Sequence, residues 1–122
     1  MRDWLEQLEA ARPAGDELLA VLVYVAGKSV AIGEVRGKGL FWGVELVRDR
    51  ESREPLVPFN ASGEALAPVA QLMKAAMERG LYLMTHWNVI MICPPLTITR
   101  EELDEGVAVL DEVLAIADEH AA

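Results

Sequence analysis

The chain has 122 residues, 52% of them hydrophobic, and carries a formal net charge of −9. The length limits it to one domain, and the apolar content is high enough for a core, which excludes a disordered tail. The acidic balance, 20 Asp and Glu against 11 Lys and Arg, argues against nucleic acid or an anionic membrane surface as a partner.

Cysteine, histidine and the apolar runs exclude further classes of protein. Cys93 is the single cysteine, so neither an intramolecular disulfide nor a cysteine-based zinc site can form. His86 has no second well-placed histidine or carboxylate cluster, since His120 lies in the fraying C-terminus, and no metal site is expected. The longest apolar run, residues 18–26, is about half of a bilayer-spanning helix, and the N-terminus shows no secretory pattern. These features predict a cytoplasmic protein.

The N-terminal region is predicted to be helical. Leu5 and Leu8 lie three residues apart in an amphipathic helix over residues 3–11, with Asp3 as its N-cap. The run Pro13-Ala-Gly15 is expected to interrupt it. A second helix follows and ends at a Gly27 cap, although the β-branched residues 22–25 leave a strand as the alternative.

Two strand-like segments, 33–39 and 40–47, predict a first hairpin, because three glycines in the first of them suit a tight turn. One alternating set in the second strand is wholly apolar, so this face should pack on helices while Glu45 points away. This set comprises Leu40, Trp42, Val44 and Leu46. The charged residues 48–53 and the following prolines Pro55 and Pro58 predict a solvated, extended loop.

The remaining elements are a helix, a second hairpin and a last helix. A helix is expected from residue 63 or 64 to 79, capped by Ser62. Its predicted buried stripe is Leu66, Val69, Ala70, Met73 and Met77. Strands are expected over 81–84 and 89–93, separated by 85–88 and ended by Pro94-Pro95. Thr99 and Glu102 form a capping box for a helix that extends to about residue 119. Its predicted stripe is Leu103, Val107, Leu110, Val113, Leu114 and Ile116.

This order predicts an α+β fold with a small, mostly antiparallel sheet of about four strands and helices packed on one face. Four stretches then carry a resemblance to a known family. They are residues 33–47 with their charged continuation to Pro55, residues 77–80, residues 85–88 and residues 94–106. In this order they resemble the C-terminal small domain of class III, pyridoxal-phosphate-dependent aminotransferases. Residues 85–88, Thr-His-Trp-Asn, are most similar to the branch that acts on taurine or β-alanine with pyruvate.

The resemblance implies a small domain at 33–122, preceded by a helical segment at 1–32 that is atypical for the family. It also implies a transaminase that passes an amino group from an amine or ω-amino acid to a keto acid. The lysine and the cofactor contacts of such enzymes belong to the large domain. This chain is therefore expected to be a fragment, to bind no pyridoxal phosphate alone and to be inactive alone.

The resemblance also indicates substrate-pocket residues, namely Met84, His86 and Trp87. Several transaminases carry an arginine at the position that corresponds to Met84, and this arginine binds the substrate carboxylate. Because methionine has no positive charge, the carboxylate-binding role is not transferred to Met84. For His86, a solvated or backbone-bonded side chain is the competing interpretation.

Other readings compete with the transaminase hypothesis. Lys28, Lys38 and Lys74 are the candidates for an imine-forming lysine, but an exposed surface role is favoured for Lys28 and Lys38. The run 26–29 resembles a phosphate loop but has Leu22 where a glycine is required. The chain could also be an independently folded, non-catalytic α+β module. Such a module would form a homo-oligomer, or bind a partner chain, through an exposed apolar face, or serve as a regulatory domain.

Overall fold

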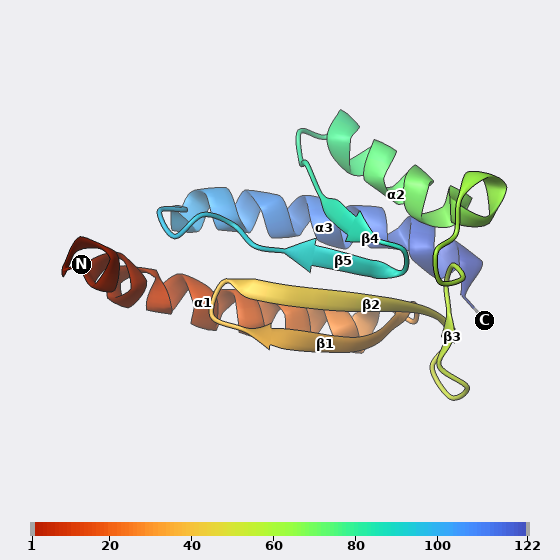
Figure 1. Ribbon diagram of the computed structural model, residues 1–122, viewed down its shortest axis with the longest axis horizontal. Coiled ribbons are helices and arrows are strands. Elements are labelled where there is room, and N and C mark those ends of the chain that lie inside the picture. The colour runs from red at the N-terminus through yellow and green to blue at the C-terminus, as the bar shows by residue number, and fades with distance from the viewer. Residues whose placement is uncertain (1, 122) are drawn as a thin grey trace.

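The computed structural model describes residues 2–121 and consists of helices packed on a small sheet. The elements are α1 (Arg2–Lys28), β1 (Ile32–Lys38), β2 (Phe41–Asp49), β3 (Glu54–Pro55), the 3₁₀ helix η1 (Gly63–Leu66), α2 (Ala67–Glu78), β4 (Met84–His86), β5 (Val89–Ile92) and α3 (Arg100–His120). The sheet order is β1-β2-β5-β4 with antiparallel pairs throughout, and β3 pairs with β2 (Figure 1). The predicted α+β class and antiparallel sheet are confirmed.

All three helices lie on one side of the sheet, and the core fills the space between. In Figure 1 α1 lies behind β1 and β2, α3 lies behind β4 and β5, and α2 packs against α3. Leu22 of α1, Leu46 of β2 and Leu114 of α3 are at most 1% exposed. The opposite face of the sheet carries no helix among residues 2–121. No helix of this described part is long and apolar enough to cross a membrane.

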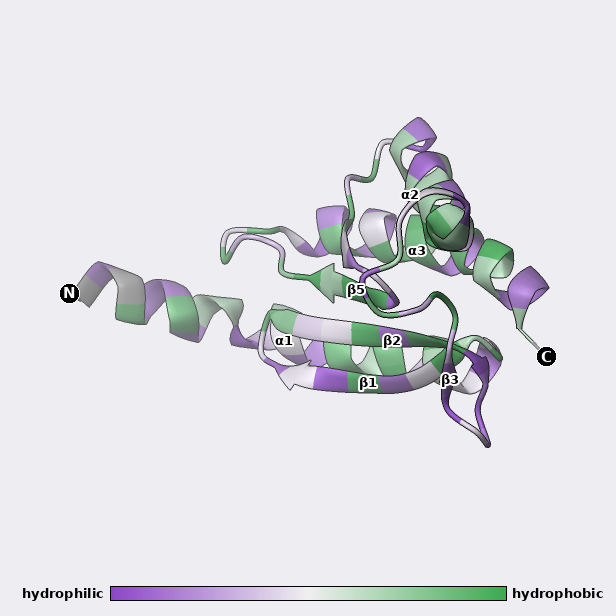
Figure 2. Cartoon of the chain, turned by 45° about the vertical axis from the view of Figure 1, so that its right-hand side comes forward, coloured by the Kyte–Doolittle hydropathy of each residue, from purple (hydrophilic) through white to green (hydrophobic). Residues whose placement is uncertain are grey.

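The N-terminal region forms one helix, and the predicted interruption at residues 13–15 is wrong. Pro13 lies inside α1, and Asp3 lies within the first turn instead of at the N-cap. Proline removes one helical hydrogen bond, but Leu18, Leu22 and Val25 anchor the following turns at helical spacing in the core. These contacts also overrule the strand alternative for residues 22–25. The first turns of α1 extend beyond the sheet (Figures 1 and 2).

Gly15 and Arg50 explain how α1 is seated. A Cβ at Gly15 would lie 2.9 Å from the carbonyl oxygen of Gly39, so glycine allows the helix to approach the β1–β2 turn closely. Gly27 does not cap the helix, which ends at Lys28. Instead the Arg50 guanidinium donates hydrogen bonds to the carbonyls of Ala26 and Ser29 near the helix end. A cation there also offsets the helix dipole.

The first hairpin forms as predicted. Trp42, Val44 and Leu46 of β2 are 7%, 0% and 0% exposed. Glu45 points to the opposite face of the sheet, which carries no helix of the described residues and is called the open face below. The Trp42 indole N–H donates to the Gly39 carbonyl at 2.7 Å, which satisfies its polar atom in the core. The following segment is less solvated than expected, because Leu56 is fully buried after the short strand β3. The alternation of apolar residues along β2 thus predicts burial correctly, whereas the polar composition of the following segment does not.

The predicted stripe of the middle helix is partly wrong. Val69 is buried, but Ala70 is exposed and Met77 is 55% exposed, while Leu72 and Ala76 take the core positions. The helix begins with η1, and Ser62 makes no side-chain cap hydrogen bond. Val69, Leu72 and Ala76 keep helical spacing within α2, so the helix turns a different side to the core from the one predicted.

The last helix and the second hairpin differ in how well sequence predicts them. The α3 capping box is present, with the Glu102 N–H donating to Thr99 Oγ1 at 3.2 Å and the Thr99 N–H donating to Glu102 Oε1 at 3.0 Å. Strand β4 covers residues 84–86 instead of 81–84, so the turn shrinks to Trp87 and Asn88. The tight turn extends the ladder into residues that the sequence assigned to the loop.

Candidate functional site

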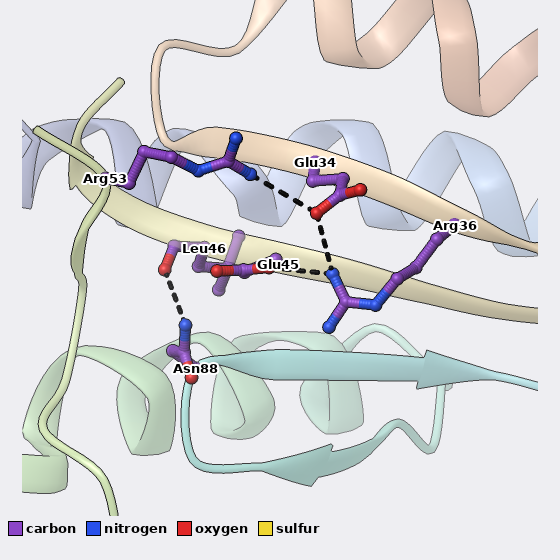
Figure 3. A network of polar contacts seen from close by, with 6 residues as sticks. All are labelled: Glu34, Arg36, Glu45, Leu46, Arg53 and Asn88. Carbon is purple, nitrogen blue, oxygen red and sulfur yellow. Dashed lines mark hydrogen bonds and ion pairs between the residues drawn. The ribbon is translucent and has the colours of Figure 1, made fainter. Parts of the chain in front are cut away.

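The turn between β4 and β5 is held firmly against β2. The Leu46 N–H donates to the Asn88 carbonyl at 2.7 Å, and Asn88 Nδ2 donates to the Leu46 carbonyl at 3.1 Å. Figure 3 shows Asn88 in the turn just before β5, directed at Leu46. Two hydrogen bonds to one residue fix both the position and the orientation of the turn. Its side chains are therefore presented on a rigid support.

Trp87 occupies this turn in a conformation that L residues avoid. Its φ is 54°, in the left-handed region, which costs a residue with a Cβ about 1 to 2 kcal/mol. The ring stacks on His86 with centroids 4.2 Å apart, and Phe59 packs against it with centroids 4.3 Å apart and a 48° tilt. Such strain persists where surrounding contacts impose it and is common at functional sites. The turn thus carries an aromatic cluster of Phe59, His86 and Trp87.

The sheet register places Met84 and His86 on the open face. One row across the sheet runs from His86 through Val89 and Glu45 to Glu34. The next row runs from Met84 through Met91 and Gly43 to Arg36. Because directly opposed residues in an antiparallel pair share a face, these side chains line one surface.

The β1–β2 half of this surface is an ion-pair network, shown in Figure 3. Arg36 lies 2.7 Å from a carboxylate oxygen of Glu45 and 3.2 Å from one of Glu34, and Arg53 reaches Glu34 at 3.2 Å. The hydrogen bond that Arg36 donates to the Glu45 carboxylate is the main cause that raises the pKa of Arg36. Two cations face two anions, so the network is neutral and Arg36 stays charged but occupied.

The three sequence-predicted pocket residues are brought close together but face different surroundings. Met84 is 51% exposed and lines a hollow of about 420 Å³ between β4, β5 and α3. His86 is exposed and Trp87 is half-buried, and both lie outside that hollow. Sequence reasoning missed Phe59 and the pairing of Arg36 with Glu45. The hairpin register contained the signal for Arg36, whereas Phe59 reaches Trp87 only through the tertiary fold.

A lysine that forms an imine with pyridoxal phosphate must be partly desolvated, and the lysines of this chain do not fit that requirement. Lys28, Lys38 and Lys74 are all exposed. The Asp111 carboxylate, 2.8 Å from Lys28 Nζ, raises the pKa of Lys28 and holds it protonated. Residues 2–121 also contain no group of three or more His, Cys, Asp or Glu arranged to hold a metal ion. The described residues therefore do not form a cradle for this cofactor.

Comparison with known proteins places the chain in a family. The model of the family Aminotransferase class-III matches residues 3–114. The chain is 35% identical over 112 residues to ethanolamine-phosphate phospho-lyase homolog 1 of Caenorhabditis elegans, covering 89% of this chain and 22% of that protein. It is 34% identical over 119 residues to the taurine–pyruvate aminotransferase of Bilophila wadsworthia, covering 92% and 24%.

Solved structures agree with the sequence relatives. The taurine:2-oxoglutarate aminotransferase from Bifidobacterium kashiwanohense, in complex with pyridoxal phosphate and glutamate, superposes with a TM-score of 0.85 at 31% identity, over 96% of this chain and 26% of that one. The chain spans about a quarter of the length of the relatives named here. With the family match over most of its residues and this shared fold, the chain belongs to the class III aminotransferases, whose cofactor is pyridoxal phosphate.

Proposed function

We propose that this chain serves as the C-terminal small domain of a pyridoxal-phosphate-dependent transaminase. Such an enzyme moves an amino group from an amine or ω-amino acid to a keto acid. The observation that carries the proposal is the TM-score of 0.85 to a taurine aminotransferase over 96% of this chain. The taurine–pyruvate aminotransferase among the sequence relatives supports the same substrate class.

The open face and the β4–β5 turn are the surface that we assign to the substrate. Met84 and Met91 contribute uncharged side chains to one row, and Arg36, at the other end of this row beyond Gly43, is already paired with Glu45. An arginine occupied in this way binds a free carboxylate poorly, because the new contact must replace an existing ion pair. The surface therefore favours the uncharged part of an amine substrate, while Trp87 and His86 supply a rigid aromatic rim.

The chain alone is proposed to be inactive. Pyridoxal phosphate supplies the electron sink for transamination, and it requires a lysine amine of low pKa. The three exposed lysines, with the pKa of Lys28 raised by Asp111, support a division of labour in which the rest of the enzyme holds the cofactor. The role of this chain is then to cover the substrate and exclude water.

Two further features belong to the proposal. Residues 33–122 are assigned to the small domain, and residues 1–32 to a helical segment that leads into it and packs on its core through Leu18 and Leu22. The location is proposed to be cytoplasmic, since the chain has one cysteine and so cannot form an internal disulfide.

A second candidate function is a non-catalytic module that self-associates. The observation that favours it is an uncovered apolar edge of the sheet, where Tyr82 is 72% and Met84 is 51% exposed. Large apolar side chains grouped on a surface commonly mark an interface.

A chimeric enzyme tests the first proposal. The matched C-terminal region of the Bilophila wadsworthia taurine–pyruvate aminotransferase would be replaced by this chain, and amino transfer from taurine or β-alanine to pyruvate would be followed. We expect a folded, cofactor-loaded enzyme with measurable turnover, whereas the same enzyme truncated before the region should have none. A chimera that folds and holds the cofactor but transfers no amino group would contradict the proposal.

A further inference from the structure

The turn between β4 and β5 fixes its backbone but leaves the orientation of the Trp87 ring to contacts from outside the turn. Only Trp87 and Asn88 separate the two strands, and the Asn88 carbonyl and side chain are hydrogen-bonded to Leu46. Trp87 has a φ of 54°, and it lies first in the turn, where a two-residue hairpin with one positive φ normally has glycine. Strain of this kind persists where neighbouring contacts impose it. Those contacts therefore deserve a role of their own in the site.

Phe59 approaches Trp87 from a second turn. The Ala61 N–H donates to the Pro58 carbonyl at 3.1 Å, and Asn60 has a φ of 59°. A hydrogen bond between the first and fourth residues, with a positive φ at the third, is typical of a type II turn, in which asparagine is tolerated. Val57 before this turn is fully buried, and Ala61 packs against the core. The turn is thus anchored on both sides and presents Phe59 at its tip.

The two turns meet at their aromatic rings. In Figure 1 the link from β3 to α2 passes beside the β4–β5 turn, and the ring centroids of Phe59 and Trp87 are 4.3 Å apart. Phe59 is 79% exposed, so it contributes little to the core, whereas Trp87 is half-buried against the core. The other ring stacked on Trp87 is His86, which is its neighbour in sequence and is itself exposed. Phe59 is therefore the ring by which a distant loop contacts Trp87.

We propose that Phe59 is a positioning residue, whose ring holds the Trp87 ring in the orientation that the substrate meets. A tryptophan side chain can adopt several rotamers, and each presents a different part of the ring to a substrate. Contact with a second ring removes this freedom before binding, so the ordering cost does not fall on the binding step. The place of Trp87 on the substrate surface rests on the proposed function, whereas the contact that holds the ring does not.

The hold on Trp87 can be measured in this chain without any reaction. In the wild type, nuclear Overhauser effects should connect the Trp87 ring with both His86 and Phe59, and the Trp87 indole N–H should have the order parameter of a rigid group. Phe59→Ala should weaken the effect between Trp87 and His86 and lower that order parameter below about 0.6. Phe59→Tyr, which keeps a ring, should restore both. The Trp42 indole, hydrogen-bonded to Gly39, should stay rigid in each variant and so reports an intact fold.

The consequence for catalysis is measured in the chimeric enzyme. Phe59→Ala should raise the KM for taurine about two- to tenfold, the range of one aromatic contact, and leave kcat nearly unchanged, because it loosens a binding contact. Phe59→Tyr should keep the wild-type KM. In a Trp87→Asn background, Phe59→Ala should have no further effect, since a residue that acts through Trp87 is silent once that ring is absent. Tyr24→Ala removes a ring of α1 that is 67% exposed and should leave the KM unchanged.

Three results would overturn the proposal. One is a Trp87 ring that stays equally ordered and equally stacked on His86 in Phe59→Ala. Another is an active chimera in which Phe59→Ala does not change the KM. The third is a KM that Phe59→Ala raises as much in the Trp87→Asn background as in the parent chimera, because Phe59 would then act without Trp87. A wild-type chimera without activity contradicts the proposed function instead, and the order of the ring in the chain then decides this inference.

Discussion

The two hairpins of the sheet are built on different principles. The first, β1–β2, has strands of seven and nine residues, a fully buried helix-facing row and a network of ion pairs on its other face. The second, β4–β5, has strands of three and four residues and a turn in which Trp87 takes a left-handed φ. The first hairpin is built for stability. The second positions a few side chains at an edge and is held in place by its neighbours.

The link between the hairpins shows which one depends on the other. The Leu46 N–H of β2 donates to the carbonyl of Asn88 in the turn of the second hairpin, and the Leu46 carbonyl accepts a hydrogen bond from Asn88 Nδ2. The second hairpin thus relies on the first for its position, whereas the first closes its own ladder with six pairs. This asymmetry is typical of sites in which a stable scaffold supports a short functional segment.

The largest expected effect comes from Leu46→Ala. The side chain is fully buried, so its truncation should lower the free energy of unfolding by about 2 to 5 kcal/mol. Denaturant unfolding of the variant would measure it. The control is Phe41→Ala in the same strand, 59% exposed, which should change stability much less. Equal losses for the two variants would mean that β2 does not have one core face and one open face.

A substitution at Gly37 tests the tightness of the first hairpin. A Cβ there would lie 2.2 Å from the Phe41 carbonyl oxygen and 2.7 Å from Trp42 Cα, both backbone atoms that cannot move aside. Gly37→Ala should therefore destabilise the chain by about 1 to 3 kcal/mol. Gly43→Ala is the matched control, because its Cβ would lie 3.4 Å from a Val89 methyl and 3.9 Å from the Arg36 carbonyl oxygen, both ordinary contacts, and it should stay within about 1 kcal/mol of wild type. Thermal unfolding of both variants decides the point.

The α3 cap should matter more to the second hairpin than to the first, because β5 leads into α3 through residues 93–99. Thr99→Ala removes the cap hydrogen bond to the Glu102 N–H and should cost about 1 kcal/mol. Hydrogen exchange should then accelerate in β4–β5 more than in β1–β2. Uniform acceleration over both hairpins would argue against separate supports.

The same cap has a predictable pH dependence. The hydrogen bond from the Thr99 N–H is the main cause that lowers the pKa of Glu102 below its ordinary value of 4.5. A depressed folded-state pKa gives stability that is present above the unfolded pKa and is lost as the pH falls through the folded value. The destabilisation caused by Glu102→Ala, which removes the carboxylate that accepts this hydrogen bond, should therefore shrink in acid. Unfolding measured at neutral and acidic pH checks this, and a constant difference would contradict it.

The smallest effect on stability is expected for Trp87→Asn. Asparagine tolerates a left-handed φ, so relief of strain offsets the lost stacking and the free energy of unfolding should stay within about 1 kcal/mol. In the chimeric enzyme, kcat/KM should fall by up to about tenfold, the equivalent of one aromatic contact of about 0.5 to 1.5 kcal/mol. Unchanged kinetics would remove Trp87 from the proposed substrate surface.

Sequence patterns predict the parts of the fold that rest on local periodicity. Val44 and Leu46 follow strand alternation, and Thr99 with Glu102 follows the capping-box spacing; both predictions are confirmed. Features that depend on distant residues were missed. In the sequence Gly15 suggests the end of a helix, but in the structure it allows α1 to approach Gly39 closely. Arg50, which follows the first hairpin, donates a hydrogen bond near the end of α1. Local propensity does not contain such contacts.

Only part of the candidate site was predictable from the sequence. The resemblance indicated Met84, His86 and Trp87, and the structure brings them to one hairpin. It did not indicate Phe59, which reaches Trp87 from a loop 28 residues earlier in the chain. The roles of these residues in catalysis remain part of the proposal that the chimera tests.

The central claim is that this chain supplies a cover for the substrate and no amine for the cofactor. The most direct test incubates the purified chain with pyridoxal phosphate, reduces the mixture with borohydride and locates any modified lysine by mass spectrometry, with amino transfer assayed in parallel. We predict no selective labelling of Lys28, Lys38 or Lys74 and no turnover. One lysine labelled in preference to the others, together with amino-group transfer, would contradict the account.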